Sequence, residues 1–279
     1  MAEIPTWEVD LFVDGPITLD RRYRTTQQKG FRPENPFYSD VEVAGIPSGG
    51  LRATVTARAP NERLAFDAAV VFFGRMLDAL AFEVDLPLFL SLTEEGSRNS
   101  RVRHHSRQII GHQQIENAFR AADDLGMTEP AFLRSLGWYR KGLYTEDPLD
   151  KFLAFWNAIE IVTAGYYRTV ESIDQERAKK GSKNQVWGCF IALWGECERW
   201  PNIPGDDRWI DENYETRTKI AHGISPVDIE TVTSVINRLD VIQRVAHRFL
   251  WDWREEILHA GWDPASQSAP NSDEEALPF

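Results

Sequence analysis

The sequence predicts an α+β protein, with a small N-terminal mixed α/β domain over residues 1–112, an all-α helical bundle over residues 113–261 and an acidic disordered tail over residues 262–279. Three observations support this division. Segments with strand-like alternation and turn signals lie before about residue 92. Helical periodicity runs alone from about residue 113, and Pro, Ser, Asp and Glu are frequent in the last residues. The 279 residues, 42% of them hydrophobic, are enough to bury a large core.

The N-terminal domain is predicted to hold a small sheet and one packed helix. Residues 7–13, 41–44 and 51–58 alternate between apolar and polar types, and residues 86–92 form a further candidate strand. Helical periodicity begins directly after Asn61. This mixture of short strands and one helix is typical of a compact α+β unit.

The clearest helix of the bundle begins at Pro148. Asp147 is a good N-cap, Pro148 suits the first helical position, and Asp150 complements the positive end of the helix dipole. Apolar residues recur along it at spacings of three or four and form one broad stripe: Phe152, Leu153, Trp156, Ile159, Val162 and Tyr166. A helix with such a stripe must pack against other elements.

Three later helices have recognisable ends. A capping box over residues 182–185 predicts a helix over 187–200, and residues 206–222 form a helix that Gly223 ends. A near equivalent of the capping box over 225–228 precedes the long final helix. The final helix carries one apolar stripe: Val232, Val235, Ile236, Leu239, Ile242, Val245, Phe249 and Trp253.

The formal net charge of −12 argues against indiscriminate binding to nucleic acid or to an anionic membrane, because the mean field of the protein repels phosphate. The N-terminus does not read as a secretory signal, and no apolar run reaches eighteen residues, so we expect a cytoplasmic protein with no membrane partner. Dinucleotide, Walker-type and serine-hydrolase motifs are absent, and His104, His105 and His112 lack a completing carboxylate or thiol. We therefore expect neither a cofactor nor a metal.

One segment suggests chemistry, the helix end from Arg217 to His222. A neutral imidazole can exchange a proton with a ribose hydroxyl, and a guanidinium can hold the charge that builds on phosphorus. No metal is needed where the substrate's own 2′-hydroxyl is the nucleophile. The two residues lie about 140° apart on an ideal helix. Only the long arginine side chain and a loosened last turn before Gly223 would bring both groups into one pocket.

The same segment also has a purely structural explanation. A histidine in the last turn is stabilised by the helix dipole when protonated, and a mid-helix arginine often forms a surface ion pair, as Glu215 and Lys219 are expected to do at i,i+4 spacing. Glu160 is a further candidate site residue, because it lies within the apolar stripe of its own helix. Its carboxylate either reaches water at the edge of the stripe or needs a partner, for which Arg217 is the candidate.

The order of these features resembles the HEPN superfamily (higher eukaryotes and prokaryotes nucleotide-binding), specifically its ApeA-like branch. The resemblance covers about residues 130–260. It depends on the Arg-x4-His-Gly helix end and on the helix that contains Asn-Ala-Ile-Glu160. Along its whole length, including the start at Trp7, the chain also resembles the group labelled methylamine-utilisation protein MauJ.

The HEPN resemblance implies a homodimeric, metal-independent endoribonuclease or RNA-binding protein, in which two copies of the helix end face each other and form one composite site. Arg217 would bind phosphate and His222 would act as general acid or base. Active members usually carry Asn, Asp or His directly after the arginine, whereas this chain carries Thr218. The alternative is a non-catalytic accessory or interaction protein, in methylamine utilisation by the second resemblance. Thr218 and the charge of −12 favour that alternative.

Two basic clusters are candidate RNA contacts, one in the polar stretch 94–112, which is either a β-ribbon or a loop between the domains, and one just before residue 182. Cationic side chains can track a phosphate backbone, although such clusters are more often a solvated surface. The candidate residues are Arg101, Arg103, Arg107, Lys179 and Lys180. The N-terminal domain is expected to sense a protein partner or a substrate.

Overall fold

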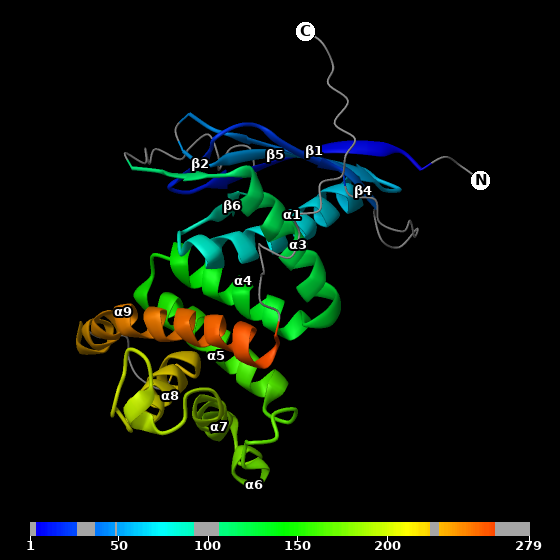
Figure 1. Cartoon of the computed structure of the whole chain (residues 1–279). Coiled ribbons are helices and arrows are strands. Elements are labelled where there is room, and N and C mark those ends of the chain that lie inside the picture. The colour runs from blue at the N-terminus through cyan, green and yellow to red at the C-terminus, as the bar shows by residue number, and fades with distance from the viewer. Residues whose placement is uncertain (1–3, 27–36, 48, 92–105, 224–228, 260–279) are drawn as a thin grey trace.

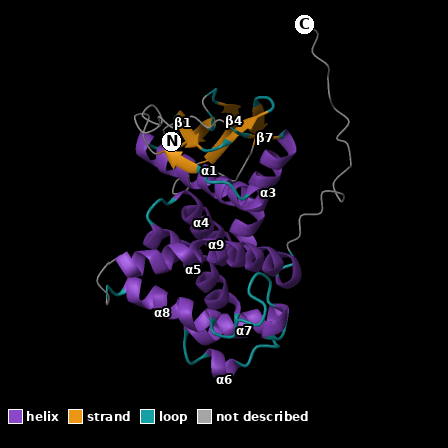
Figure 2. Cartoon of the chain, turned by 90° about the vertical axis from the view of Figure 1, so that its left-hand side faces the viewer, coloured by secondary structure: helices purple, strands orange, loops and turns teal. Residues whose placement is uncertain are grey.

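The chain folds as an α+β protein with a sheet at one end and helices in successive layers beyond it (Figures 1 and 2). A computed structural model describes residues 4–26, 37–47, 49–91, 106–223 and 229–259. In Figure 2, α1 and α3 lie beneath the sheet, α4, α5 and α9 lie in the middle, and α6, α7 and α8 lie at the far end. The predicted fold class is confirmed at this level, and the HEPN-like arrangement of the bundle stays a prediction.

The main sheet has the strand order β3-β4-β5-β1-β6, and all neighbouring strands are antiparallel. The strands are β1 (Thr6–Asp14), β3 (Tyr23–Thr26), β4 (Phe37–Gly45), β5 (Leu51–Arg58) and β6 (Phe89–Ser91). On β5 alternate residues from Leu51 to Ala57 are buried, because successive side chains of a strand point to opposite faces. The strands predicted over 7–13, 41–44 and 51–58 are confirmed, and the one predicted over 86–92 shrinks to three residues.

Two short strands, β2 (Ile17–Leu19) and β3, were not predicted. A third, β7 (Gln108–Ile110), falls in the stretch 94–112, which the sequence left open between a β-ribbon and a loop, and it pairs with β2 in parallel. Strands of three or four residues hold too few positions for alternation to be recognised. Because β7 is a strand, the end of the basic stretch 94–112 belongs to a sheet, whereas residues 92–105 lie outside the described residues.

Helix α1 (Glu62–Val84) connects the sheet to the bundle. The side chain of Asn61 caps it by accepting a hydrogen bond of 3.0 Å from the backbone N–H of Leu64. One side of α1 covers β1 and β5, and the other packs on α3 (His112–Thr128) and α4 (Pro130–Tyr144). The buried apolar residues of the sheet and the bundle form one continuous cluster. The predicted domain boundary at residue 112 is therefore not marked by a break in the core.

Helix α5 (Pro148–Tyr166) lies at the centre of the bundle and packs on α4, α7, α8 and α9. The carboxylate of Asp147 accepts hydrogen bonds of 2.9 Å and 3.0 Å from the backbone N–H groups of Leu149 and Asp150, which confirms the predicted N-cap. Most of the predicted stripe is fully buried, including Phe152, Trp156 and Ile159. The position of α5 follows from this apolar content.

Helix α7 differs from its prediction at both ends. It spans Ser182–Trp194 instead of 187–200, and its N-cap is Gly181, with no side-chain cap from a capping box. The left-handed backbone of Gly195 (φ 77°) ends the helix early, and Cys197–Arg199 form a separate 3-10 turn. Helix α6 (Gln175–Ala178) precedes α7 as a single turn.

The last two helices carry the candidate site. Helix α8 (Trp209–Ala221) has His222 as its C-cap, and Gly223 follows with φ 58°, which confirms that this glycine ends the helix. Helix α9 (Ile229–Asp252) continues into a π-helical turn, Trp253–Ile257. The predicted cap at 225–228 and the predicted tail at 262–279 lie outside the described residues.

The predicted α9 stripe is wrong at one residue, Ile236, which is 52% exposed and so does not belong to the buried face. Val235 and Ile242 fill the stripe that packs into the core, and Ile236 lies about 100° around the helix from Val235. None of the described helices combines the length and the apolar character that crossing a bilayer requires.

Candidate functional site

An ion pair joins the two central helices of the candidate site. Nε and Nη2 of Arg217 on α8 each lie 3.1 Å from Oε2 of Glu160 on α5. The Glu160 side chain is 11% exposed and the Arg217 side chain is 27% exposed. Of the two interpretations that the sequence left open for Glu160, contact with water or a pair with Arg217, the structure shows the pair. Because both nitrogens contact the same oxygen, Nη1 of Arg217 lies outside the pair.

The interface around this pair holds polar atoms that the packing leaves unused. Oε1 of Glu160, Nε1 of Trp156 and Oδ1 of Asn213 are buried with no hydrogen-bond partner among the described residues. Trp156 and Glu160 lie one turn apart on α5, and Asn213 and Arg217 lie one turn apart on α8. An unsatisfied buried polar group costs about 1–3 kcal/mol. This region therefore gives up stability that a fully paired interface would keep.

Aromatic packing fixes the distance between α5 and α8 beside the ion pair. The rings of Trp156 and Trp209 have centroids 5.9 Å apart, and Trp209 also stacks on Phe190 of α7 at 6.0 Å. The Nδ2 atom of Asn213 donates a hydrogen bond of 2.6 Å to the carbonyl of Trp209. These ring contacts and this hydrogen bond fix the position of the α8 backbone that carries Arg217.

His222 lies apart from the ion pair within one chain. Its residue is exposed, and its backbone N–H donates a hydrogen bond of 3.1 Å to the carbonyl of Thr218. In the part of the chain that the structure describes, no hydrogen bond or ion pair joins His222 to Arg217 or Glu160. The hydroxyl of Thr218 donates a hydrogen bond of 2.9 Å to the carbonyl of Tyr214, so this side chain bonds to the backbone of its own helix. The structure thus brings two of the three candidate residues together.

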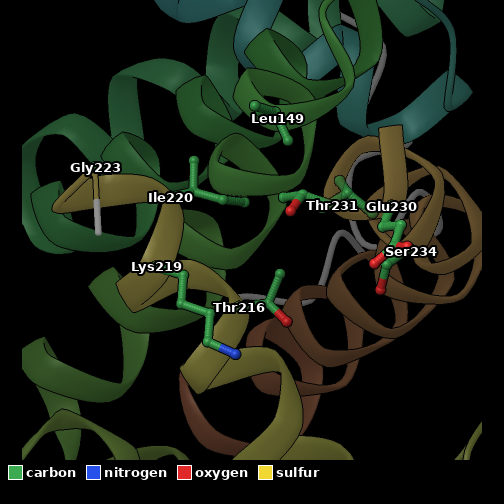
Figure 3. Close-up of a pocket in the computed structure, with 9 residues that line it drawn as sticks. Leu149, Thr216, Lys219, Ile220, Gly223, Glu230, Thr231 and Ser234 are labelled. Carbon is green, nitrogen blue, oxygen red and sulfur yellow. The ribbon is translucent and has the colours of Figure 1, made fainter. Parts of the chain in front are cut away.

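A groove of about 310 Å³ opens between α8, α9 and the start of α5, directly beside this helix end (Figure 3). In Figure 3 the side chains of Thr216 on α8 and Thr231 on α9 reach toward the space between the two helices. The groove is lined by Leu149, Thr216, Lys219, Ile220, Gly223, Glu230, Thr231, Ser234 and Val235. The sequence analysis missed this groove. The spacing of Thr216, Lys219 and Ile220 along one face of α8 was the signal available.

Charged pairs border the groove on α8 and α9. Nζ of Lys219 lies 2.7 Å from Glu215, which confirms the predicted i,i+4 pair, and the hydrogen bond from Lys219 lowers the pKa of Glu215 below its usual value. Glu212, three residues before Glu215 on α8, lies 3.2 Å from Arg238, and this pair ties α9 to α8. Both pairs are at least partly exposed, so each adds little stability.

The chain was compared with family models, curated proteins and solved structures. No family model, curated protein or solved structure matches it. Among the described residues, no group of three His, Cys, Asp or Glu side chains could hold a metal ion. The function must therefore be argued from the residues of the site itself.

The three candidate RNA contacts that lie among the described residues, Arg107, Lys179 and Lys180, do not form one surface. Nη1 of Arg107 donates a hydrogen bond of 2.5 Å to the carbonyl of Pro47, and Lys179 forms an ion pair of 2.8 Å with Glu176, while Lys180 is exposed. Arg107 directly precedes β7 in the sheet layer, whereas the two lysines follow α6 at the opposite end of the molecule (Figure 2). Arg101 and Arg103 lie outside the described residues.

Proposed function

We propose that this protein is a metal-independent endoribonuclease or RNA-binding protein of the HEPN type that acts as a homodimer, with Arg217 and His222 as its composite site and Glu160 as the residue that positions Arg217. The observation that supports the proposal is the incomplete ion pair. Glu160 holds the guanidinium through one oxygen, Nη1 stays outside the pair, and the arginine side chain is 27% exposed. Such a guanidinium is oriented and can still receive a phosphate.

The proposed reaction uses only the substrate and these side chains. The 2′-oxygen of a ribose attacks the adjacent phosphorus, and the bond from phosphorus to the 5′-oxygen breaks. His222 takes the proton of the 2′-hydroxyl or returns a proton to the 5′-oxygen, and Arg217 stabilises the charge on the phosphoryl oxygens. The products are a 2′,3′-cyclic phosphate and a 5′-hydroxyl.

A second copy of the chain is part of the proposal because His222 does not contact Arg217 within one chain. The side chains of Ile229 and Ile236, on the first two turns of α9, are 85% and 52% exposed. Large apolar side chains exposed beside a candidate site are typical of a surface that becomes buried on association. They support a dimer in which α9 of each copy borders the helix end of the other.

The direct test compares an RNA oligonucleotide with the same sequence built from 2′-deoxy sugars, in the presence of a metal chelator. We expect cleavage of the RNA alone, with 2′,3′-cyclic phosphate ends. The substitution His222→Asn should lower the rate at least 100-fold, because general acid–base catalysis contributes about that much. The matched control is His259→Asn, at another exposed histidine. Equal cleavage of both oligonucleotides, or equal loss in both variants, would contradict the mechanism.

A non-catalytic accessory or interaction protein is the second candidate, and one observation favours it. The ion pair of Glu160 and Arg217 by itself accounts for both residues as elements of packing, and Thr218 stands where active members usually have Asn, Asp or His. This candidate predicts no cleavage and the same RNA affinity for the native chain and for Arg217→Met. A gene neighbourhood that encodes methylamine dehydrogenase subunits would support it, and one of phage-defence genes would count against it.

A further inference from the structure

The interface between α5 and α8 holds three buried polar atoms that the chain itself does not pair. They are Nε1 of Trp156, Oε1 of Glu160 and Oδ1 of Asn213, and none of them has a hydrogen-bond partner among the described residues. Trp156 is fully buried, Asn213 is 1% exposed and the side chain of Glu160 is 11% exposed. Buried polar groups are nearly always paired with protein or with ordered water, so three such atoms in one interface indicate a bound group from outside the chain.

Two contacts between the helices place these atoms beside one another. The rings of Trp156 and Trp209 lie 5.9 Å apart. One turn further along α5, Glu160 pairs with Arg217, which lies two turns after Trp209 on α8. Asn213 lies midway between Trp209 and Arg217, on the same side of α8. Its buried amide therefore lies between the two contacts, where it faces both Trp156 and Glu160.

The three atoms determine the chemistry of the bound group. The indole N–H of Trp156 only donates, whereas the carboxylate oxygen of Glu160 and the amide oxygen of Asn213 only accept. The bound group must therefore accept one hydrogen bond and donate two. An ammonium ion has no lone pair for the indole, and an anion is repelled by the carboxylate. Water meets the requirement, and buried waters make about three hydrogen bonds to groups of this kind.

We propose that one buried water molecule bridges α5 and α8, accepting a hydrogen bond from Nε1 of Trp156 and donating to Oε1 of Glu160 and Oδ1 of Asn213. Both oxygens of Glu160 are then paired, Oε2 with Arg217 and Oε1 with the water. The carboxylate cannot turn away from the guanidinium without losing the water as well. Within the ribonuclease, Asn213 is thus a positioning residue for Arg217, and this last statement rests on the proposed function.

A second tryptophan provides an internal control. Nε1 of Trp253 is also buried without a partner among the described residues. Its ring lies 6.1 Å from the ring of Tyr166 and 5.4 Å from that of Phe249. Tyr166 lies six residues after Glu160 on α5, about 9 Å along the helix axis. Trp253 therefore lies away from the two unpaired oxygens, and a lone donor does not hold a buried water, which needs about two to four polar partners.

The experiment measures magnetisation transfer between water and the indole N–H groups of the full chain by NMR, with the tryptophan indoles isotopically labelled. Trp156→Phe and Trp253→Phe identify the two signals. We expect a cross-peak with a long-lived water at Trp156 and none at Trp253. No cross-peak at Trp156, or equal cross-peaks at both residues, would overturn the assignment.

A crystal structure at high resolution provides a second measurement. It should show the water within about 3.2 Å of Nε1 of Trp156, Oε1 of Glu160 and Oδ1 of Asn213. A direct hydrogen bond from Trp156 to Glu160, with no water between them, would contradict the bridge.

A matched pair of variants tests the acceptor on α8. Asn213→Leu removes the amide oxygen at nearly constant volume, and the carbonyl of Trp209 keeps its backbone hydrogen bond within the helix. Thr218→Val removes a hydroxyl that bonds to the carbonyl of Tyr214 on its own helix. Thermal unfolding establishes that both variants are folded. We expect the water cross-peak of Trp156 to disappear in the first variant and to persist in the second. A cross-peak that persists unchanged in folded Asn213→Leu overturns the bridge.

The bridge and the ribonuclease proposal fail separately, because the NMR measurements need no RNA. A chain that holds the water and cuts no RNA keeps the bridge and loses the proposed function. Where RNA is cut, Asn213→Leu should lower kcat by up to about tenfold and leave KM unchanged, since the guanidinium is oriented less firmly and still binds phosphate. An unchanged kcat in a variant that has lost the water would contradict the positioning role of Asn213.

Discussion

Two of the ion pairs that connect helices in the described part of the chain differ in how completely their atoms are paired. Asp78 of α1 and Arg140 of α4 form the first, with Nε of the arginine 2.6 Å from Oδ1 and both side chains 14% exposed. Glu160 of α5 and Arg217 of α8 form the second, with both contacts at 3.1 Å and the arginine 27% exposed. Both connect neighbouring helices across a long stretch of sequence.

The first pair uses more of its hydrogen-bonding capacity. Nη1 of Arg140 donates a hydrogen bond of 3.1 Å to the carbonyl of Leu88, and its guanidinium lies over the ring of Tyr144 at 5.7 Å. A Cβ atom on Gly137 would lie 3.0 Å from Oδ2 of Asp78, so the helices approach closely there. In the second pair, Oε1 of Glu160 is buried and unpaired. The difference indicates that the first pair serves packing and that the second keeps capacity for a further group.

The largest effect should come from breaking the first pair. Arg140→Met leaves the buried carboxylate of Asp78 without its partner, so we expect the free energy of unfolding to fall by about 3–5 kcal/mol. Denaturant titration measures this loss. The control is Arg63→Met, whose pair with Asp67 is exposed and should contribute less than about 0.5 kcal/mol. Similar losses in both variants would remove the basis for treating the first pair as structural.

Removal of the arginine of the second pair should act on activity more than on stability. Arg217→Met takes away a donor to the transition state, and such a loss lowers kcat by about 100–1000-fold. The free energy of unfolding should fall by no more than about 2 kcal/mol, because part of the guanidinium already contacts water. Arg217→Lys should recover the charge but little of the rate. RNA cleavage measured beside denaturant titration separates the two effects, and a loss of stability without a loss of rate contradicts the role given to Arg217.

The parts of the fold that the sequence predicted are set by local chemistry or by a long pattern. Asp147 caps α5 because the residues that form the cap are adjacent in sequence. The position of Glu160 within a stripe of six apolar residues identified it as a candidate, but the stripe alone left open whether its carboxylate reaches water or pairs with Arg217. The predicted cap at 182–185 failed because Gly181, which adopts φ 141°, supplies the N-cap position instead. Intrinsic signals identify an element more reliably than its ends.

The groove could not be predicted in the same way, because its walls converge only in three dimensions. Leu149 on α5 and Thr216 on α8 lie far apart in sequence, and neither sits in a recognisable motif. Nor does a sequence show which side chains stay exposed. Ile236 fits the apolar stripe of α9 by spacing and is nevertheless half-exposed, since the core takes Val235 beside it.

The two pairs should also differ in their dependence on a second copy of the chain, because only the second pair is proposed to be completed by a partner. Ile236→Glu puts a charge on the exposed surface of α9, and we expect dimerisation at least tenfold weaker, or about 1.4 kcal/mol. Sedimentation equilibrium measures the dissociation constant. Ile191→Glu on α7, where the residue is 40% exposed, is the control and should leave it unchanged. A native chain that stays monomeric at all concentrations excludes the composite site.

The smallest effect should come from neutralising the acid of the second pair. Glu160→Gln keeps one oxygen for Arg217, and its NH2 group replaces the buried oxygen that has no partner, so the lost charge is offset by a lower desolvation cost. We expect a change in the free energy of unfolding of no more than about 1 kcal/mol, and a fall in kcat of about tenfold with KM unchanged, because a neutral oxygen orients the guanidinium less firmly. Asp78→Asn should lower the free energy of unfolding by about 2–3 kcal/mol. The hydrogen bond to the carbonyl of Leu88 keeps the Arg140 guanidinium in place, so its charge stays buried without the carboxylate that balanced it. If Glu160→Gln lowers the free energy of unfolding as much as Asp78→Asn does, the second pair stabilises the fold as much as the first. Arg217 would then have no hydrogen-bonding capacity left for a further group.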